Sequence, residues 1–144
     1  MDKKIILIGK TGSGKTTLIQ RIEALDMTYR KTQTIQNYLN FIDTPGEYLE
    51  NRSYYKALIV TAVDADVIGL VQDCSSQEVW LPPMFSSAFS KETIGIITKT
   101  DLARGEEELE RARKALERSG ATRFFYVSAA ENAGFGELTA YIRG

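Results

Sequence analysis

An unbroken glycine-rich motif near the N-terminus could do phosphate chemistry. It occupies residues 9–16 and fits the pattern G-x-x-x-x-G-K-[ST] in full. Its glycines allow the backbone to wrap closely around phosphates and to point N–H groups inward. We expect phosphate binding by Gly9, Lys10, Thr11, Gly12, Ser13, Gly14, Lys15, Thr16 and Thr17. Lys15 should reach the β- and γ-phosphates as a catalytic residue, and Thr16 should place its hydroxyl on Mg²⁺.

A second short motif, Asp43-Thr44-Pro45-Gly46, could complete the phosphate site. An Asp at the end of a strand can hold Mg²⁺, usually through water. Gly46 could turn its backbone N–H toward a γ-phosphate with no Cβ in the way. The alternative is a plain type I or II turn, which Pro-Gly also favours.

Two further motifs indicate which base is bound. The run Thr98-Lys99-Thr100-Asp101 resembles the [NT]-K-x-D motif of GTPases. Asp101 could accept hydrogen bonds from N1–H and the 2-amino group of guanine, and adenine offers neither donor. The aliphatic part of Lys99 could lie over the base. The alternative for the whole run is a capped strand-to-helix turn with no role in binding. Ser128-Ala129 resembles the last GTPase motif, whose backbone N–H meets the guanine O6.

These motifs need strands and helices to position them. Short apolar runs without polar alternation suit parallel strands buried on both faces. Such runs predict strands at Lys4–Ile8, Leu39–Ile42, Val67–Val71, Thr93–Ile97 and Phe124–Val127. Apolar residues at helical spacing predict helices through Leu18–Leu25, Leu109–Leu116 and Leu138–Ile142. Glu106–Glu108 suits the start of the second helix, and Gly120 suits its end.

Strands that alternate with helices predict an α/β fold with a mainly parallel sheet. With the motif at residues 9–16, this is the three-layer P-loop NTPase fold, with helices on both faces of the sheet. Ligands of such sheets bind beyond the carboxyl ends of the strands, where all four motifs fall. The length of 144 residues and the lack of a linker predict a single domain, 1–144.

Composition excludes several other functions. The chain has no His, which excludes a His general base, and its one cysteine, Cys74, excludes an internal disulfide and a thiolate zinc cluster. We expect Cys74 to be a buried filler. The net charge of -1 argues against nucleic acid as the main partner. No apolar run approaches the roughly 18–20 residues that span a bilayer. We therefore expect a cytoplasmic protein without a membrane span.

Taken together, the chain resembles a translation-factor-type GTPase domain and, more narrowly, the EutP/PduV family. The narrower resemblance rests on the P-loop together with Lys31–Gln33, Asp43–Tyr48, Tyr54–Leu58, Leu81–Pro83 and Thr98–Asp101. It implies a small nucleotide-binding protein linked to ethanolamine or propanediol utilisation. It also implies a bacterial microcompartment, with a shell or associated protein as a partner. Some family members are linked to phosphoryl transfer to acetate.

The roles of Glu47 and of the mobile-loop threonines have more than one interpretation. Glu47 stands where many GTPases carry a Gln that orients water; it could be catalytic or could cap a helix. Its negative charge beside the γ-phosphate should slow hydrolysis. The mobile-loop threonine of the Mg²⁺ site is expected to be Thr32, with Thr34 as runner-up and Thr28 also available.

Other side chains allow two interpretations each. No arginine finger can be assigned, although Arg30 and Arg52 lie near the expected mobile loops. Tyr48, Tyr54 and Tyr55 could pack a helix or face a partner. The run Trp80–Phe85 could open a helix or form an exposed docking site.

Three functions therefore compete. The leading one is a GTP- and GDP-binding protein that needs Mg²⁺, hydrolyses GTP slowly and acts as a switch or assembly factor. The second is a nucleotide-dependent kinase of a small carboxylate such as acetate, using GTP or ATP. The third is a nucleotide-bound docking module with negligible turnover.

Overall fold

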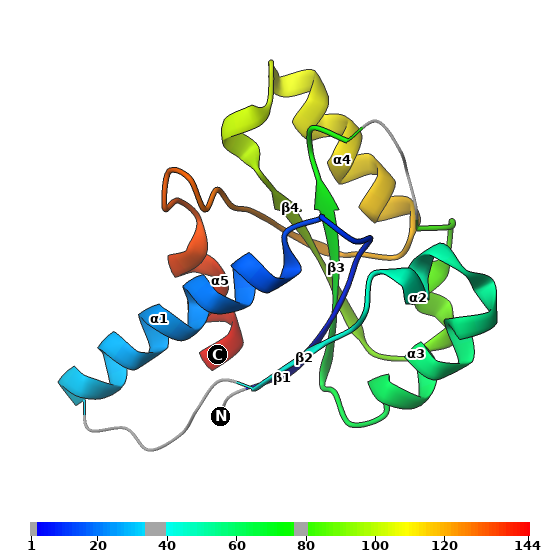
Figure 1. Ribbon diagram of the computed structural model, residues 1–144, viewed down its shortest axis with the longest axis horizontal. Coiled ribbons are helices and arrows are strands. Elements are labelled where there is room, and N and C mark those ends of the chain that lie inside the picture. The colour runs from blue at the N-terminus through cyan, green and yellow to red at the C-terminus, as the bar shows by residue number, and fades with distance from the viewer. Residues whose placement is uncertain (1–2, 34–39, 77–80) are drawn as a thin grey trace.

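The computed structural model describes residues 3–33, 40–76 and 81–144. Within these ranges, five strands form one sheet in the order β2-β1-β3-β4-β5, and every neighbouring pair is parallel (Figure 1). The strands are β1 (Lys4–Ile8), β2 (Asn40–Asp43), β3 (Val67–Asp73), β4 (Glu92–Thr98) and β5 (Arg123–Tyr126).

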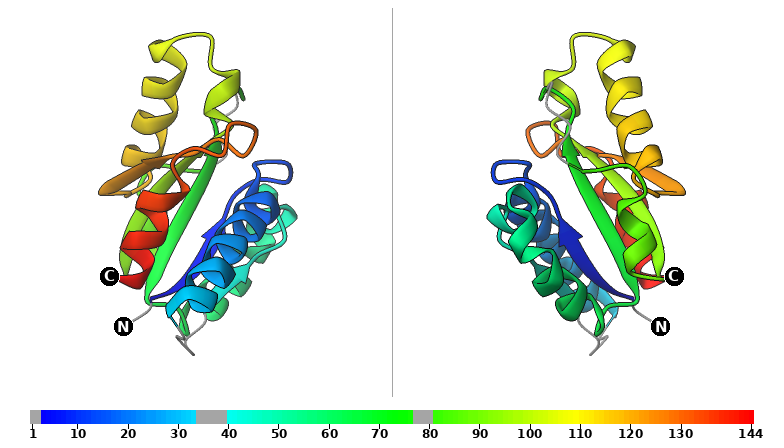
Figure 2. Two further views of the ribbon diagram at one scale, coloured as in Figure 1. Left: turned by 90° about the vertical axis from the view of Figure 1, so that its left-hand side faces the viewer. Right: turned by 90° about the vertical axis from the view of Figure 1, so that its right-hand side faces the viewer.

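Helices connect most of these strands. The α-helices are α1 (Lys15–Gln33), α2 (Glu47–Glu50), α3 (Tyr55–Ala62), α4 (Glu106–Arg118) and α5 (Phe135–Arg143). Short 3-10 helices are η1 (Arg52–Tyr54), η2 (Phe85–Ala88) and η3 (Thr100–Leu102). Helices α1 and α5 cover one face of the sheet, and α2, α3 and α4 cover the other (Figure 2). The predicted three-layer α/β fold is confirmed.

Strand β1 shows why a continuous apolar run becomes a central strand. Its four residues Ile5–Ile8 are all 0% exposed. Successive side chains of a strand point to opposite faces. Ile5 and Leu7 therefore pack with α1 and α5, and Ile6 and Ile8 pack with the helices of the other face. Burial of each such side chain contributes about 1.5–3 kcal/mol.

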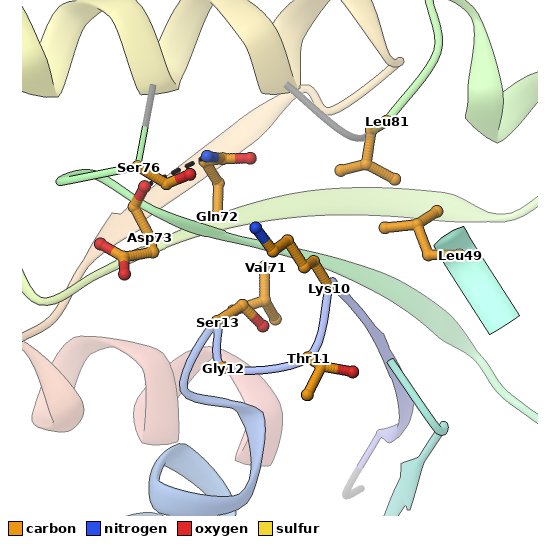
Figure 3. A pocket seen from close by; sticks show the side chains of 10 residues that line it. All are labelled: Lys10, Thr11, Gly12, Ser13, Leu49, Val71, Gln72, Asp73, Ser76 and Leu81. Atoms are coloured by element: carbon orange, nitrogen blue, oxygen red, sulfur yellow. Dashed lines mark hydrogen bonds between the residues drawn. The ribbon is translucent and has the colours of Figure 1, made fainter. Parts of the chain in front are cut away.

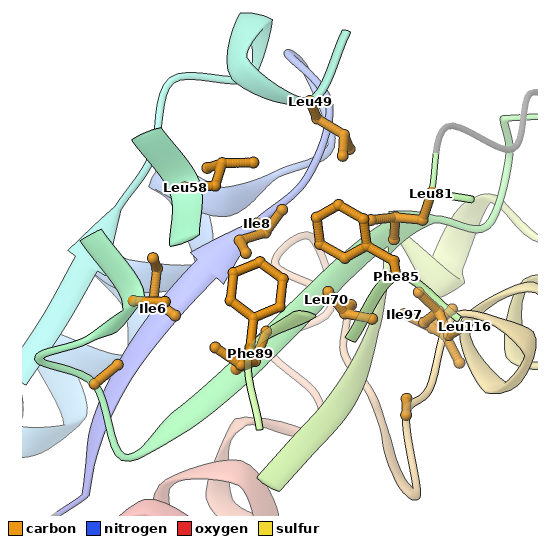
Figure 4. Packing of buried hydrophobic residues seen from close by; sticks show 14 of the residues in the cluster. Ile6, Ile8, Leu49, Leu58, Leu70, Leu81, Phe85, Phe89, Ile97 and Leu116 are labelled. Atoms are coloured by element: carbon orange, nitrogen blue, oxygen red, sulfur yellow. The ribbon is translucent and has the colours of Figure 1, made fainter. Parts of the chain in front are cut away.

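The link between β3 and β4 differs from the other connections. Among the described residues it contains only η2, and it covers the sheet with Leu81, Phe85 and Phe89, which are all buried (Figure 4). Phe85 and Phe89 pack against each other with their ring centroids 5.3 Å apart. Met84 is 67% exposed, and Trp80 lies outside the described residues. In the described part of this run, Leu81 and Phe85 therefore belong to the core, whereas Pro83 and Met84 are exposed.

The observed boundaries of the helices and strands differ only slightly from the predicted ones. Helix α1 is the main exception: it runs to Gln33, well beyond the apolar pattern that ends at Leu25. Helix α4 begins at Glu106 as expected, and Gly120, with φ of 116°, follows its end. Within the described residues, no helix is long and apolar enough to cross a bilayer.

Candidate functional site

The parallel sheet brings five loop segments to one edge. The loops after β1, β2, β3, β4 and β5 all leave the carboxyl ends of their strands. In an open α/β sheet this edge is where ligands bind. Four of these loops carry the motifs at residues 9–16, 43–46, 98–101 and 128–129, and the fifth adds Asp73.

The glycines of the P-loop, residues 9–16, are required by its backbone. Gly12 and Gly14 have φ of 84° and 101°, a region that side chains with a Cβ rarely adopt. A Cβ on Gly9 would come within 2.7 Å of Ser13 Oγ and 2.8 Å of the Val71 carbonyl oxygen. The loop thus reaches its curvature through glycine, and its last turn leads directly into α1.

Lys15 lies inside this loop. Only 7% of the residue is exposed, and its Nζ donates a hydrogen bond to the Gly9 carbonyl at 2.8 Å. An ammonium group carries three N–H donors, so this bond fixes its position and leaves it able to donate further. The arrangement suits an ammonium group that meets phosphate oxygens.

Thr16 and Asp43 come together where the P-loop faces the end of β2. Thr16 Oγ1 lies 3.4 Å from Asp43 Oδ2. A hydroxyl and one carboxylate fit Mg²⁺, which usually takes one or two protein oxygens plus waters and substrate phosphates. The described residues contain no group of three or more His, Cys, Asp or Glu that could hold a metal alone. The hydroxyl of Thr16 and the carboxylate of Asp43 fit the two protein oxygens that a nucleotide-bound Mg²⁺ would take.

Gly46 approaches the P-loop very closely. A Cβ at this position would lie 2.2 Å from the backbone N of Thr11, so no other residue fits without movement. Thr44 fixes this segment to β1, because its Oγ1 donates a hydrogen bond to the Leu7 carbonyl at 2.8 Å. The Asp43–Gly46 segment thus lines the cleft beside the P-loop, and its role in phosphate binding stays a prediction.

An open cleft runs along these groups. Its volume is about 380 Å³, and its lining includes Thr11, Lys15, Thr16, Asp43 and Gly46. A smaller recess of about 80 Å³ adjoins it and shares Gly14, Thr17 and Lys99 with it. The volume of the cleft lies in the usual range for small-molecule sites, roughly 300–1,000 Å³.

Lys99 links the base motif to the P-loop. Its Nζ donates to the Gly12 carbonyl at 2.8 Å and lies 3.1 Å from Asp73 Oδ2. Its backbone is left-handed, with φ of 57° and ψ of 38°, which is uncommon for a residue with a side chain. Thr98 adds a second link, because its Oγ1 donates to the Ser13 carbonyl at 2.6 Å.

Asp73 is a site residue that sequence reasoning missed. Ser75 donates to Asp73 Oδ1 through its backbone N–H at 2.8 Å and through its hydroxyl at 2.6 Å. Burial opposes the charged form, but these bonds and Lys99 hold the pKa of Asp73 below its ordinary value. The available signal was its place at the end of an apolar strand, on the edge that carries the other motifs.

Asp101 and Ser128 meet beyond the ends of β4 and β5. Ser128 Oγ donates to Asp101 Oδ1 at 2.7 Å and accepts from the Glu131 N–H at 3.1 Å. The Ser128 N–H already donates to the Ala133 carbonyl at 2.9 Å. A backbone donor for a ligand at this loop would therefore come from Ala129, which lines the small recess.

Cys74 is a structural neighbour of this site. It is 1% exposed, and its Sγ lies 3.2 Å from the Lys99 carbonyl oxygen, to which it donates. Burial, together with nearby acidic groups, raises the pKa of the thiol to about 11. The prediction of a small buried filler is confirmed.

Most residues expected in the mobile loop belong to α1. Thr32 lies in α1, 17 residues after Lys15, which corresponds to about 25 Å along a helix. Thr28 and Arg30 lie in the same helix, and Thr34 falls outside the described residues. The threonine of the Mg²⁺ site therefore stays a prediction.

The residues after Gly46 form short helical elements. Glu47 is the first residue of α2, and Arg52 begins η1. Tyr48 stacks on Tyr54 with ring centroids 4.8 Å apart, and Tyr55 meets the edge of Phe85 at 5.6 Å. Tyr55 therefore packs onto the core, whereas Tyr54 remains 40% exposed.

A family model matches nearly the whole chain. The family model described as "PduV-EutP: Ethanolamine utilisation - propanediol utilisation" matches residues 2–144. A propanediol utilization protein, PduV, of Citrobacter freundii is 39% identical over 97% of this chain and 93% of its own length. A protein of Escherichia coli K12 named "Probable acetate kinase EutP" is 36% identical over 82% of this chain and 74% of its own.

A solved structure shares the fold. It is translation elongation factor SelB of Methanococcus maripaludis, in complex with the GTP analogue GppNHp. The TM-score is 0.69 at 22% identity, and the match covers 98% of this chain. This chain corresponds to 33% of the length of that protein.

Proposed function

Because the chain belongs to the PduV-EutP family of ethanolamine and propanediol utilisation proteins, we propose that it is a guanine-nucleotide-binding protein of those pathways. We propose that it hydrolyses GTP slowly and acts as a switch or assembly factor. The observation that carries the proposal is the bridge made by Lys99, which joins the P-loop at Gly12 to the base motif that contains Asp101.

Guanine specificity would come from Asp101. Its carboxylate accepts one hydrogen bond from Ser128 and has further lone pairs for the N1–H and 2-amino donors of guanine. The N–H of Ala129 would meet the guanine O6. Adenine has an acceptor at N1 and no 2-amino group, so it would offer no donor to the remaining lone pairs of Asp101.

Phosphate binding would use the P-loop and Mg²⁺. Lys15 and the backbone N–H groups of residues 9–16 would hold the phosphates. Thr16 and Asp43 would hold Mg²⁺, directly or through water. When bound, the ion would neutralise negative charge on the phosphates.

Slow hydrolysis follows from the residues beside the γ-phosphate position. Glu47 follows Gly46 directly, where a carboxylate would oppose charge on the phosphate. No arginine is assigned to offset that charge. P-loop GTPases without a supplied arginine turn over at roughly 10⁻⁴ to 10⁻³ per second.

The setting proposed for this activity follows from the family. We place the protein in the cytoplasm beside a bacterial microcompartment, with a shell or associated protein as partner. The support is the family resemblance and the family match to both utilisation pathways.

A second candidate is phosphoryl transfer to acetate. The support is the name of the Escherichia coli relative, which is 36% identical to this chain. The chain contains no His, so such a transfer would have to proceed without the most common general base.

One experiment separates the two candidates. Purified protein is incubated with γ-labelled GTP or ATP and Mg²⁺, with and without acetate, and bound nucleotide, free phosphate and acetyl phosphate are measured together. The proposal predicts GTP binding and slow phosphate release that acetate does not change. Acetyl phosphate formed at about 1–100 per second, the range of kinases, would favour the second candidate.

A further inference from the structure

The loop after β3 lies next to the base motif because of the register of the sheet. Strand β3 pairs with β4 so that Asp73 stands opposite Thr98, and Lys99 follows directly. Asp73 and residues 10–13 of the P-loop also line one small pocket of about 110 Å³ (Figure 3). A carboxylate that belongs to neither motif therefore lies beside both.

Two residues of this loop hold Lys99, one by its backbone and one by its side chain. Cys74 donates through its N–H to the Thr98 carbonyl and through its Sγ to the Lys99 carbonyl, both at 3.2 Å. Asp73 Oδ2 lies 3.1 Å from Lys99 Nζ. A left-handed backbone such as that of Lys99, with φ of 57°, persists where its surroundings enforce it. The loop after β3 therefore fixes the conformation of Lys99.

Asp73 is itself held in place. Ser75 donates to its Oδ1 through both the backbone N–H and the hydroxyl, and the side chain of Asp73 is 17% exposed. Burial acts against the charged form, but the bonds from Ser75 and Lys99 outweigh it and keep the pKa of Asp73 below its ordinary value. At neutral pH the carboxylate is therefore a charged acceptor in a fixed position.

Lys99 in turn holds a part of the P-loop that packs against little else. Its Nζ donates to the Gly12 carbonyl at 2.8 Å. Among the described residues outside the immediate chain neighbours of Gly12, no atom lies within 4 Å of the place that a Cβ on this glycine would take. Gly12 has no side chain and a φ of 84°, so its conformation is not enforced by packing at that point. The hydrogen bond from Lys99 supplies this restraint.

Lys99 needs a partner to stay in this position. Its side chain is 39% exposed, and a lysine loses rotamer entropy when it is held in one conformation. The carboxylate of Asp73 offsets this loss through a charge-assisted contact. Without that charge, the ammonium would spend more time in water, and the Gly12 carbonyl would lose its donor.

We propose that Asp73 is a positioning residue of the nucleotide site, which acts through Lys99 to hold the P-loop in the conformation that binds phosphate. The inference rests on the proposed function, because it takes nucleotide binding at this edge as given. It goes beyond that function by assigning a role to a residue outside all four motifs.

The test is a double-mutant cycle on the full chain, with the dissociation constant for GDP as the readout. Asp73→Asn keeps the shape of the side chain and removes its charge, so we expect GDP to bind about tenfold more weakly. In a Lys99→Met background the same change should cost less than about twofold, because no ammonium is left to position. Asp64→Asn, at an exposed residue, is the matched control and should change nothing in either background.

A second variant and a second nucleotide separate positioning from direct contact with the base. Ser75→Ala removes one of the two donors to Asp73, so it should weaken GDP less than Asp73→Asn does, and again only when Lys99 is present. Asp73→Asn should weaken GDP and inosine diphosphate by the same factor, because the 2-amino contact of Asp101 is untouched. A loss confined to GDP would overturn the inference in favour of direct base recognition.

A measurement without nucleotide tests the contact itself. The ¹³Cε signal of Lys99, identified by its absence in Lys99→Met, should move in Asp73→Asn toward the position of mobile, exposed lysines. An unmoved signal, or equal losses of GDP affinity with and without Lys99, would overturn the inference while the proposed function stands. If the wild type preferred ADP, the proposed function would fail, and the same cycle measured with ADP would still decide the role of Asp73.

Discussion

Lys15 is held before any ligand arrives. Its ammonium bonds to the Gly9 carbonyl at 2.8 Å, and 7% of the residue is exposed. Little side-chain entropy remains to be lost when phosphate binds, which is an advantage for affinity. Because Lys15 is held inside the P-loop, its positive charge lies close to where the phosphates would bind.

Replacement of this lysine tests the phosphate site. Lys15→Ala should abolish GTP and GDP binding, because a charge-assisted contact is lost in a partly desolvated loop. Equilibrium binding of a fluorescent guanine nucleotide measures the effect, with circular dichroism as the check on folding. Lys114→Ala, at an exposed lysine of α4, should bind normally. Normal nucleotide affinity in a folded Lys15→Ala protein would contradict the assignment of phosphate binding to the P-loop.

Asp101 governs the base in this account. Asp101→Asn should weaken GTP by about 100-fold or more, because a site built to hydrogen-bond a ligand rejects mismatched groups strongly. The same change should improve binding of xanthosine triphosphate, whose 2-oxo group accepts the new amide donor. Competition binding with the two nucleotides measures the exchange, and Asp64→Asn, at an exposed residue, serves as the control. If the variant kept its preference for GTP, Asp101 would not be the guanine acceptor.

We expect Glu47 to affect the rate of GTP hydrolysis rather than the affinity for GTP. If the Glu47 carboxylate faces the γ-phosphate as proposed, Glu47→Gln removes a negative charge there, so single-turnover GTP hydrolysis should rise above the unaided range of roughly 10⁻⁴ to 10⁻³ per second. The dissociation constant for GTP should change little. An unchanged rate would indicate that Glu47 only begins α2.

At the scale of elements, the Asp43–Gly46 turn couples α2 to the P-loop. Gly46→Ala would place a Cβ 2.2 Å from the Thr11 backbone N, although the helical φ of -57° at this position suits Ala. The strain must therefore come from the contact and not from the backbone. We expect α2 to shift away from the P-loop.

That shift should appear in the choice between nucleotides. Gly46→Ala should weaken GTP more than GDP, because only GTP has the γ-phosphate that the Gly46 N–H would meet. Affinities for both, measured by isothermal titration calorimetry, test this expectation. Gly136→Ala, at a helical glycine with open space around it, is the matched control. Equal losses for both nucleotides would contradict a γ-phosphate contact at Gly46.

The strands and the P-loop could be predicted because their signals are local. Ile5–Ile8 is a continuous apolar run, which predicts a buried strand. Residues 9–16 match a motif whose glycines already indicate the conformation of the loop. The contact of Lys99 with Asp73 could not be predicted, because it joins the ends of β4 and β3 across 26 residues. The length of α1 was also missed, because its C-terminal half lacks the apolar spacing that defines a packed helix face.

The whole molecule explains why scattered motifs form one site. Parallel pairing of all five described strands puts every strand's carboxyl end at the same edge, so motifs separated by more than 100 residues become neighbours. The two buried clusters on the faces of the sheet hold this edge in place. That residues 1–144 form a single domain stays a prediction.

The central claim is that this edge binds guanine nucleotides in preference to adenine nucleotides. The most direct measurement is competition of GDP and ADP for a fluorescent guanine nucleotide bound to the wild-type chain in the presence of Mg²⁺. The account predicts displacement by GDP at a concentration at least about 1,000-fold lower than ADP requires, since adenine offers no donor to the remaining lone pairs of Asp101. Equal displacement by GDP and ADP, or no nucleotide binding at all, would contradict it.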